Sequence, residues 1–509
     1  MVRLLIGLRG AITRNQLRQG KRGALIAGLV LALLSGVGTL YLGTVSYPRL
    51  AAGADVIALV FGLWLGGHLA QRALSGEPTL RPEMFALLPL RRRALAAALL
   101  AVNLADPALI LFAVPFAAVI ALGAQAGAVA AIVGAAGALL TIVLAGVAGT
   151  VAAGILGPGA RRGHDIGTMV TALAISIISV AGITLPWLVT VLRERSAPWL
   201  IALVRVLPSG WAAVAVDAAA RSQWLWVALP LAGLAALSGV IALAWPAVLA
   251  RRMTRAGTPS RSARPHAERR ALLPRTAVGA VAAKEMRLWV RDPIRLTPLL
   301  VAVIVGAAMC AIPRLTTGTG QLLPFAGAAT VAIAAACACN LYGNDGTSLW
   351  LTISAPGSEP ADVRGRQLAW LLIAGPYALA LTVLLTAVSG QGWAWPWALG
   401  GLAALLGGAC GLIPLASLIW VVPLDDAGNP TPQYPLKVYP TLIAVVLTAA
   451  PSAVVALAGS LAGLSWLAWL AVPVGIATGA ALAWKLGAIA TGRLHHTQVA
   501  VLGALASAG

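Results

Sequence analysis

The chain has 509 residues, of which 60% are hydrophobic and only 10% are charged, and its mean hydropathy is +0.90. A soluble domain carries about 25% charged residues, so this composition excludes an ordinary soluble enzyme and predicts a polytopic membrane protein. The formal net charge of +21 would suggest nucleic-acid binding in a soluble protein. Here the basic residues lie in short loops without interleaved aromatic residues, so we expect them to set membrane orientation and we expect no nucleic-acid partner.

The hydrophobic runs are too long to belong to a single core helix. The run from Ala94 to Leu156 contains no Lys, Arg or Glu, and as one helix it would be about 95 Å long, against the roughly 30 Å of a bilayer core. Comparable apolar runs recur along the whole chain. They predict an all-α fold of about twelve membrane-spanning helices, roughly six in each half: 24–45, 53–71, 94–122, 127–156, 167–192, 223–250, 297–316, 321–342, 367–389, 394–422, 438–460 and 464–486.

The distribution of basic residues predicts the orientation of these spans. With the amino terminus in the cytoplasm, six basic residues lie at the outer side and the other thirty of the 36 Lys and Arg lie at the cytoplasmic side. The outer six are Arg49, Arg193, Arg195, Arg205, Arg221 and Arg314. The opposite orientation would violate the positive-inside rule, so both termini are expected in the cytoplasm. Richness in Gly, Ala and Arg suggests a high-GC bacterium and hence a bacterial plasma membrane.

The two halves look like copies of one plan. Three parts are expected: 1–250 as the first six-span half, 251–276 as a basic cytoplasmic linker, and 277–509 as the second half. Each half opens on a basic amphipathic segment, which predicts a helix lying in the membrane interface. In the second half this segment holds Lys284, Glu285 and Arg287. A local ion pair of Glu285 is the simpler expectation, with a neighbouring helix or a partner protein as alternatives.

The loop between the second and third spans is the least generic stretch of each half. In the first half its candidate residues are Met84, Phe85, Leu87, Leu88 and Pro89, and in the second half they are Asp345, Leu349, Trp350, Ile353 and Pro356. A short helix with an apolar face at a membrane surface binds either lipid or a groove on a partner protein. An interfacial turn without a partner is the alternative. Asp345, beside Gly346, is expected to cap the start of its helix.

Several motifs of the second half together resemble one known family. K-E…R-D-P, then N-x-x-G-x-D-G, then L-W-L-x-x-x-x-P resemble the permease subunit of ABC-2 type exporters, and L-P-S-G-W at 207–211, in the expected outer loop before the sixth span, is similar to the same family. The resemblance covers both halves in order, although the first half lacks the Lys-Glu pair and the Asp-Gly. It implies an interfacial elbow helix before each half, and coupling helices at 77–90 and 344–356 that dock on separate ATPase subunits.

The chain has no G-x-x-x-x-G-K-[ST] motif and therefore no P-loop to hold nucleotide phosphates. The resemblance accordingly implies a transporter subunit that is not itself an enzyme and binds no cofactor or metal. Two copies of an ABC ATPase would bind ATP and Mg. The scarcity of charge in the spans suggests that, besides membrane lipids, the chain contacts a small amphipathic or lipid-like cargo such as a drug or antibiotic.

Asp106, together with Asn103, is the acidic residue placed deepest in an expected span. Intramembrane carboxylates often contact substrates or carry protons, but Pro107 follows, and the carboxylate could instead satisfy backbone groups freed at a kink. A functional Asp106 favours the alternative of a proton-coupled secondary transporter of the major-facilitator layout. The G-x-L-x-D-x-x-G-R-[RK] loop of that family is missing. A lipid scramblase or a membrane scaffold is a third alternative.

Four other polar residues receive structural expectations. Asp55 and His68 lie near span ends and are expected at the membrane interfaces. His495 and His496 form a pair in the tail with no carboxylate expected nearby, so no metal site is predicted there.

Overall fold

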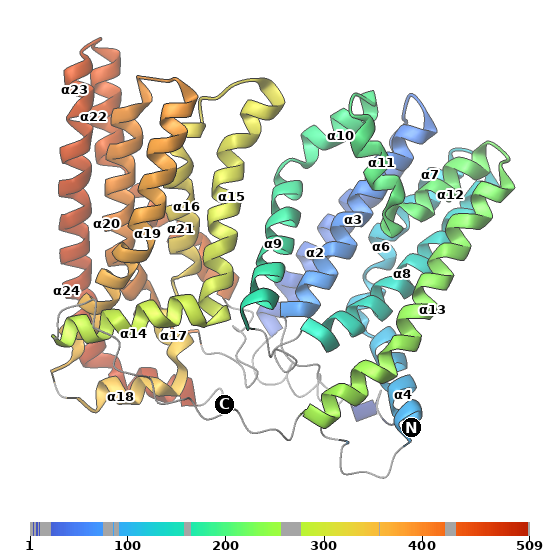
Figure 1. Ribbon diagram of the computed structural model, residues 1–509, viewed down its shortest axis with the longest axis horizontal. Coiled ribbons are helices and arrows are strands. Elements are labelled where there is room, and N and C mark those ends of the chain that lie inside the picture. Colours follow the sequence, from blue (N-terminus) through green and yellow to red (C-terminus); the bar gives the residue numbers. More distant parts are fainter. Residues whose placement is uncertain are drawn as a thin grey trace. The chain divides into compact units, whose positions relative to one another are not determined.

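Figure 1 shows the computed structural model of the chain, in which every regular element of the described residues is a helix. The structure describes residues 22–74, 91–156, 164–255, 276–355, 357–422 and 434–506, with Phe85 and a few isolated positions near the amino terminus. Five of the predicted coupling positions fall in the gaps between these ranges. Met84, Leu87, Leu88, Pro89 and Pro356 lie outside the described residues, as do most of the amino-terminal amphipathic segment and most of the linker.

The chain divides into two compact units. Unit 1 comprises Met1–Arg162 and Ala181–Ser262, and unit 2 comprises Gly163–Val180 and Ala263–Gly509. This division differs from the expected halves mainly at Gly163–Val180, which precedes the expected boundary in sequence but groups with unit 2. The apolar sequence of that segment carries no signal for either unit.

Unit 1 is built around α3 and α8, with a core in which the rings of Phe61 and Phe116 meet edge to face, 4.4 Å between centroids. Its elements, with α9 shared between the units, are α2 (Arg22–Thr44), α3 (Leu50–Leu74), α4 (Arg92–Leu104), α5 (Pro107–Ile110), α6 (Ala113–Phe116), α7 (Ala118–Ala124), α8 (Ala128–Leu156), α9 (His164–Ile183), α10 (Leu185–Glu194), α11 (Pro198–Val206), η3 (Pro208–Gly210), α12 (Trp211–Ala220) and α13 (Trp224–Arg255).

The expected span at 94–122 is not one continuous helix, because the structure breaks it into the four helices α4 to α7. The first break falls at Asp106. The proline that follows has no N–H to donate, and its ring disfavours helical backbone at the preceding residue, so α4 ends at Leu104 and α5 begins at Pro107.

Unit 2 contains long helices that run side by side, with α14 lying across their lower ends (Figure 1). Its elements are α14 (Ala277–Arg291), α15 (Pro293–Thr317), η4 (Leu323–Phe325), α16 (Ala326–Cys337), α17 (Leu341–Asp345), η5 (Gly346–Leu349), α18 (Trp350–Ile353), α19 (Glu359–Ser389), α20 (Ala394–Ile419), α21 (Tyr434–Leu447), α22 (Ala450–Leu461), α23 (Ser465–Trp469) and α24 (Ala471–Ala506). Helices α20 and α24 share the most extensive contact, since glycines let their backbones touch.

Seven described helices are long and apolar enough to cross a membrane, or up to ten if each of three bent pairs forms one span. All but one of these coincide with spans expected from the sequence. The exception is the pair Pro198–Val206 and Pro208–Ala220, bent by 86°, where the sequence predicts an outer loop. Expected spans 24–45, 94–122 and 321–342 coincide only with shorter apolar helices. The coarse prediction of an all-α polytopic membrane protein agrees with these helices.

Candidate functional site: a buried charge network

The corner between α14 and α15 follows directly from the R-D-P sequence. Pro293 disfavours helical backbone at Asp292, whose φ of −89° and ψ of 116° end α14. The Asp292 carboxylate then accepts a hydrogen bond from the backbone N–H of Ile294 at 3.0 Å, which caps α15, and Pro293 occupies the first turn, where it costs no hydrogen bond. This corner brings the charged face of α14 beside the start of α15.

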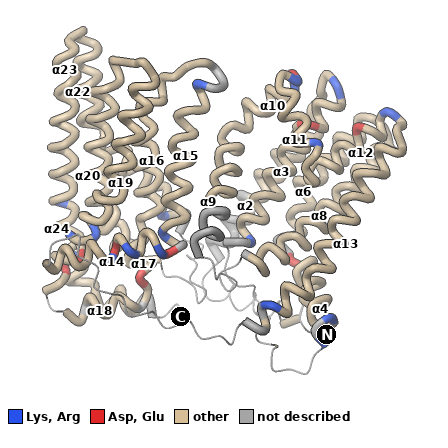
Figure 2. The backbone as a smooth tube through the Cα atoms, in the orientation of Figure 1, with Lys and Arg blue, Asp and Glu red and all other residues tan. Residues whose placement is uncertain are grey.

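Two arginines and three carboxylates from four elements form a buried network at this corner. Arg295 of α15 contacts both Glu285 of α14 and Asp345 of α17. Arg366 of α19 also contacts Asp345, and its guanidinium lies 3.0 Å from Glu285 and 2.9 Å from Asp362. Figure 2 shows the charges of unit 2 gathered at the level of α14 and α17, with few charges along the helices above. The network therefore ties α14, α15, α17 and α19 together at one end of the unit.

A lysine and a tyrosine complete the network. Lys284 is half-exposed and lies 3.3 Å from Glu285 and 3.6 Å from Asp345. The Tyr342 hydroxyl donates a hydrogen bond to Asp362 at 2.8 Å, and its ring lies 4.3 Å below the guanidinium of Arg366. Burial, together with the charge of Asp362, raises the pKa of Tyr342 well above its usual value, so the phenol remains a donor.

The side chains at the centre of the network are almost completely removed from water: Arg366 is 0% exposed, Glu285 1% and Asp345 4%. Transfer of such charges from water costs several kcal/mol per ion, and only mutual pairing offsets this cost. The loss of any one partner therefore leaves an uncompensated buried charge. For this reason the ion pairs resist separation of α14, α15, α17 and α19 from one another.

The N-x-x-G-x-D-G motif shapes the segment that enters the network. The Asn340 side chain donates to the carbonyl of Val422 at 2.8 Å and accepts from its N–H at 3.1 Å, which clamps the segment to the end of α20. A Cβ on Gly343 would come within 2.3 Å of the Val422 carbonyl oxygen. Gly346 has φ +57° and ψ −145°, a conformation that essentially only glycine adopts. Asn340, Gly343 and Gly346 thus place Asp345 between the two arginines.

One expectation for these residues is wrong. Asp345 is the last residue of α17, and its carboxylate pairs with Arg295 and Arg366 instead of capping a helix start. Glu285 contacts Lys284, as expected for a local pair, and it also pairs with arginines of α15 and α19, which was the alternative of a neighbouring helix. Arg287 points to the exposed side of α14.

The short helix α18 presents two sides. Leu349, directly before it, is 1% exposed and packs in the core of unit 2, whereas Trp350 and Leu351 are 56% and 59% exposed. Nothing in the described packing covers these two apolar side chains. In unit 1, Phe85 is partly buried against the cluster that includes Leu95.

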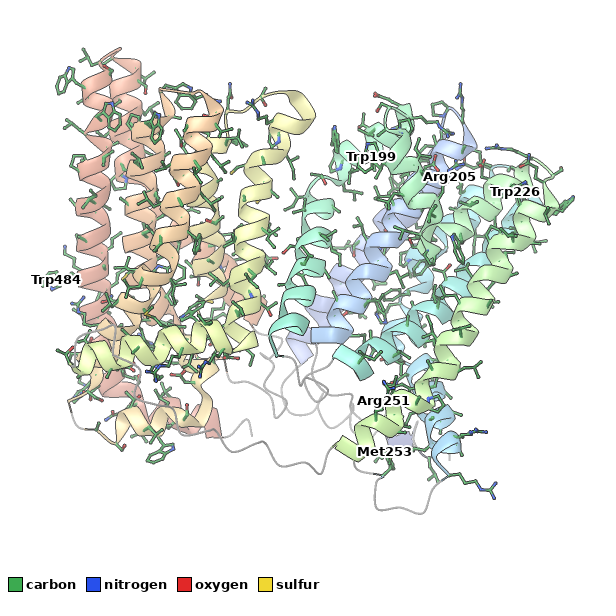
Figure 3. All side chains as sticks on the ribbon, viewed as in Figure 1. Trp199, Arg205, Trp226, Arg251, Met253 and Trp484 are labelled. Atoms are coloured by element: carbon green, nitrogen blue, oxygen red, sulfur yellow. The ribbon has the colours of Figure 1, made fainter. Side chains whose placement is uncertain are left out.

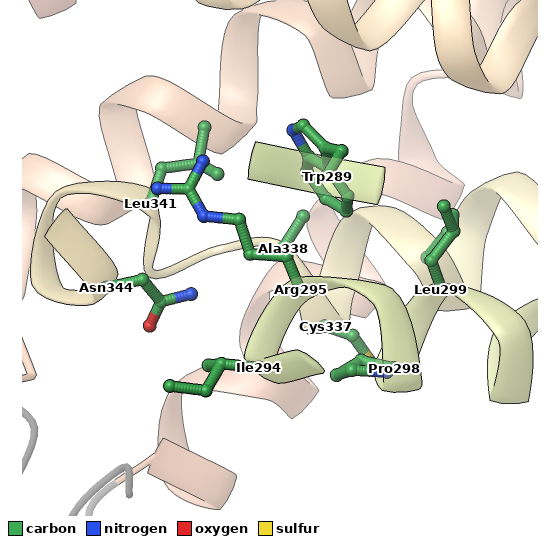
Figure 4. A pocket seen from close by; sticks show the side chains of 10 residues that line it. Trp289, Ile294, Arg295, Pro298, Leu299, Cys337, Ala338, Leu341 and Asn344 are labelled. Carbon is green, nitrogen blue, oxygen red and sulfur yellow. The ribbon is translucent and has the colours of Figure 1, made fainter. Parts of the chain in front are cut away.

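A small pocket of about 10 Å³ adjoins the network between α14, α15, α16 and α17 (Figure 4). Asn344 lies on one side of it, and Leu299 and Pro298 lie on the other. Arg295 reaches past it, but its charge is already paired with Glu285 and Asp345. The pocket is therefore small, and the charge of Arg295 beside it is already neutralised by its carboxylate partners.

In unit 1, Asp106 lies at the break between α4 and α5, beside helix α3. Arg72 of α3 donates to its carboxylate at 2.8 Å. His68, one turn before Arg72, is buried with its ring edge-on to Phe112, 5.0 Å between centroids. His68 is thus buried inside unit 1, and its expected position near a membrane interface stays a prediction. Asn103 is partly buried near the end of α4.

A second ion-pair cluster of unit 1 holds the bent pair α11 and α12 against α3. Arg205 contacts Asp55 at 2.5 Å and 3.2 Å and lies 3.8 Å from Asp217, which also pairs with Arg221 at 2.6 Å. Asp55 is 0% exposed, so it lies inside the protein, and its expected position near a membrane interface stays a prediction. Figure 3 shows Arg205 at the same end of unit 1 as Trp199 and Trp226. The segment Leu207–Trp211 is the 86° bend of this pair and not a loose loop.

The tail histidines also have an unexpected neighbour. The Nδ1 atom of His495 lies 3.1 Å from a carboxylate oxygen of Glu359, which contradicts the expected absence of a nearby carboxylate. A single His–Glu contact is not a metal site, and the described residues contain no group of three or more His, Cys, Asp or Glu that could hold a metal ion.

Comparison of the chain with protein-family models, with curated proteins and with solved structures finds no match. The interpretation of the network therefore rests on its own geometry and on the motifs that form it.

The pKa of Asp345 provides a test of the network. Burial alone would raise this pKa, but Arg366, Arg295 and Lys284 outweigh burial and lower it from 3.8 to about 2. A lowered carboxyl pKa stabilises the fold above the unfolded-state value and loses that contribution as the pH falls through the folded-state value. We expect wild type to exceed Asp345→Asn in thermal stability by a constant margin from pH 8 to about 5, and the margin to shrink between pH 4 and 2. A margin independent of pH down to 2 would contradict this assignment.

Proposed function

We propose that this chain is the transmembrane permease subunit of an ABC-2 type exporter, with two six-span repeats, both termini in the cytoplasm and ATP hydrolysed by separate subunits. One observation carries the proposal. The two motif groups that resemble this family, K-E…R-D-P and N-x-x-G-x-D-G, lie far apart in sequence yet meet in one buried network beside the exposed α18. A permease needs this kind of rigid link between a docking loop and its spans.

In this proposal α18 is a coupling helix. Trp350 and Leu351 supply an exposed apolar surface of the kind that fits a groove on a partner protein. Nucleotide-driven movement of the ATPase would push α18, and Asp345 would transmit the push through Arg295 to α15 and through Arg366 to α19. The loop at 77–90 would serve the second ATPase subunit in the same way.

Helix packing within each unit supports the repeat. In unit 1, the fourth expected span is α8 and packs on the sixth, α13, and in unit 2 the corresponding α20 packs on α24. Helix α14 would be the elbow helix of the second repeat, with Lys284 and Arg287 on its exposed side and Glu285 buried. An amphipathic cargo, such as a drug or antibiotic, fits the apolar spans.

The rival function, a proton-coupled transporter of the major-facilitator layout, depends on Asp106. The carboxylate of Asp106 is paired with Arg72, and a paired carboxylate carries protons only if the pair opens during transport. The rival predicts loss of transport in Asp106→Asn, whereas the exporter predicts that transport survives this change.

The proposal is tested by purifying the tagged protein from its own host in mild detergent and identifying what co-purifies. We expect a stoichiometric ATPase with a P-loop. We also expect Trp350→Asp to lower the recovery of this ATPase at least about tenfold, because the small charged side chain cannot fill the apolar groove that tryptophan would fill. Leu461→Asp is the matched control, because Leu461 is 79% exposed at the end of another helix of unit 2, α22. Equal recovery of the ATPase with Trp350→Asp and Leu461→Asp would refute docking at α18.

A further inference from the structure

Helix α24 is much longer than a membrane span. Its 36 residues rise about 54 Å, whereas the hydrocarbon core of a bilayer is about 30 Å thick. Exposed tryptophans mark both ends of the span-length part, because Trp466 and Trp469 precede α24 and Trp484 stands before Lys485. Figure 3 shows Trp484 directed away from the unit. Residues 487–506 therefore extend beyond the part needed to cross a membrane.

The extension packs against the loop that carries α18. Ala490, Leu494 and Val501 are 0%, 1% and 5% exposed, and they share one core cluster with Leu349 and Tyr342. Helix α24 contacts η5, the turn that contains Leu349. In Figure 1 the terminal part of α24 lies at the level of α18, below α14. Side chains of the extension thus fill the space behind the loop.

The other side of the extension is exposed. Val499 is 76% exposed, although it lies on the same helix between Leu494 and Val501. One polar contact of the extension reaches α19, since His495 lies 3.1 Å from Glu359, and just before the extension the Gln367 side chain donates to the carbonyl of Ala483 at 2.8 Å. The contacts of α24 therefore reach the start of α19 as well as the loop.

The loop cannot hold its own shape. Helix α18 has four residues and η5 has four, and isolated helices shorter than about 12 residues are unstable in water. Asp345 fixes the beginning of the loop through its arginines, but Leu349 is the large apolar side chain that anchors the segment directly before Trp350. Leu349 must therefore pack against another part of the chain, and α24 supplies part of that packing surface.

We propose that residues 487–506 of α24 are a positioning element that holds the η5–α18 segment in place, so that the partner-binding surface at Trp350 and Leu351 exists only while this extension is docked. The positioning part of this proposal stands on the packing alone. Only the consequence for partner binding rests on the proposed exporter function.

The test measures the exposure of Leu349 directly. Leu349→Cys is introduced into the full-length protein with its four native cysteines replaced by alanine, and labelling by a water-soluble maleimide is followed in detergent. The extension of α24 is then altered by the double change Leu494→Asp with Val501→Asp. The control is Val499→Asp, on the exposed side of the extension. A milder pair, Leu494→Ala with Val501→Ala, replaces the Asp pair if that variant fails to purify as a single species.

We expect labelling at least about tenfold faster in the Leu494 and Val501 variant, because local opening exposes the thiol, and an unchanged rate with Val499→Asp. An unchanged labelling rate in a well-folded Leu494 and Val501 variant would overturn the positioning role, whatever the function of the protein. ATPase recovery is measured in parallel without the Leu349→Cys change. Faster labelling with undiminished ATPase recovery would overturn the link to partner binding, while absence of any ATPase even from the unaltered chain would count against the proposed function alone.

Discussion

Replacement of Arg366 by Ala is expected to destabilise unit 2 more than any other single change in the charge network. Arg366 is 0% exposed and faces Glu285, Asp345 and Asp362, so its removal leaves three buried carboxylates with too little positive charge. The removal of one partner from a buried ion pair costs about 3–5 kcal/mol. The measurement is the free energy of unfolding in detergent or, where unfolding is irreversible, the midpoint of thermal aggregation.

The matched control is Arg364→Ala on the same helix. Arg364 is only partly buried and donates a single hydrogen bond to Gln367 at 2.9 Å, so its loss should cost about 1 kcal/mol or less. A double-mutant cycle with Asp362→Ala adds a second check, because removal of both partners should cost less than the sum of the two single changes. Equal stability of the two arginine variants would show that the network does not hold these helices together.

Replacement of Gly407 by Ala is expected to force α20 and α24 apart. A Cβ at Gly407 would lie 2.4 Å from the Cα and carbonyl carbon of Gly479, and these backbone atoms cannot move without shifting the whole helix. Overpacking of this kind costs about 1–3 kcal/mol, which exceeds the gain of up to about 1 kcal/mol from replacing glycine by alanine within a helix. Thermal stability in detergent should fall.

Gly401 of the same helix is the control, since no atom lies within 4 Å of a Cβ placed there. Gly401→Ala should therefore be neutral or slightly stabilising, through helix propensity alone. The sign of the effect should differ between two identical substitutions six residues apart. The same sign at both positions would show that close backbone contact does not limit the α20–α24 interface.

Much of the helical layout could be predicted from the residue order because its causes are local. Apolar runs without charge predict helices, since a backbone surrounded by lipid must satisfy its own hydrogen bonds, and most long helices coincide with the expected spans. The R-D-P corner between α14 and α15 is equally local, because a proline restricts the residue before it. The Asp106–Pro107 sequence predicts a break in the helix for the same reason, but the long apolar run around it favours one continuous span, and the break prevails in the structure.

The partners of the charges could not be predicted in this way. Arg295 and Arg366 look like ordinary basic residues near span starts, which the positive-inside rule explains without any contact. The same reasoning placed Arg205 at the outer side but could not assign Asp55 as its partner, 150 residues away in sequence. Opposite charges near the same ends of neighbouring spans were the available signal, and that signal does not select one pair among many.

By itself, the sequence determined that this is an all-helical membrane protein, and it located most of the long helices. It also singled out the motifs around Glu285 and Asp345. Only the tertiary structure decided that these carboxylates share Arg295 and Arg366, that 198–220 forms a bent helical pair, and that the end of α24 supports Leu349. The physical reason is the range of the forces involved. Helix formation and turns depend on neighbours a few residues apart, whereas the pairing of a buried charge depends on which distant side chains are brought within about 4 Å of it.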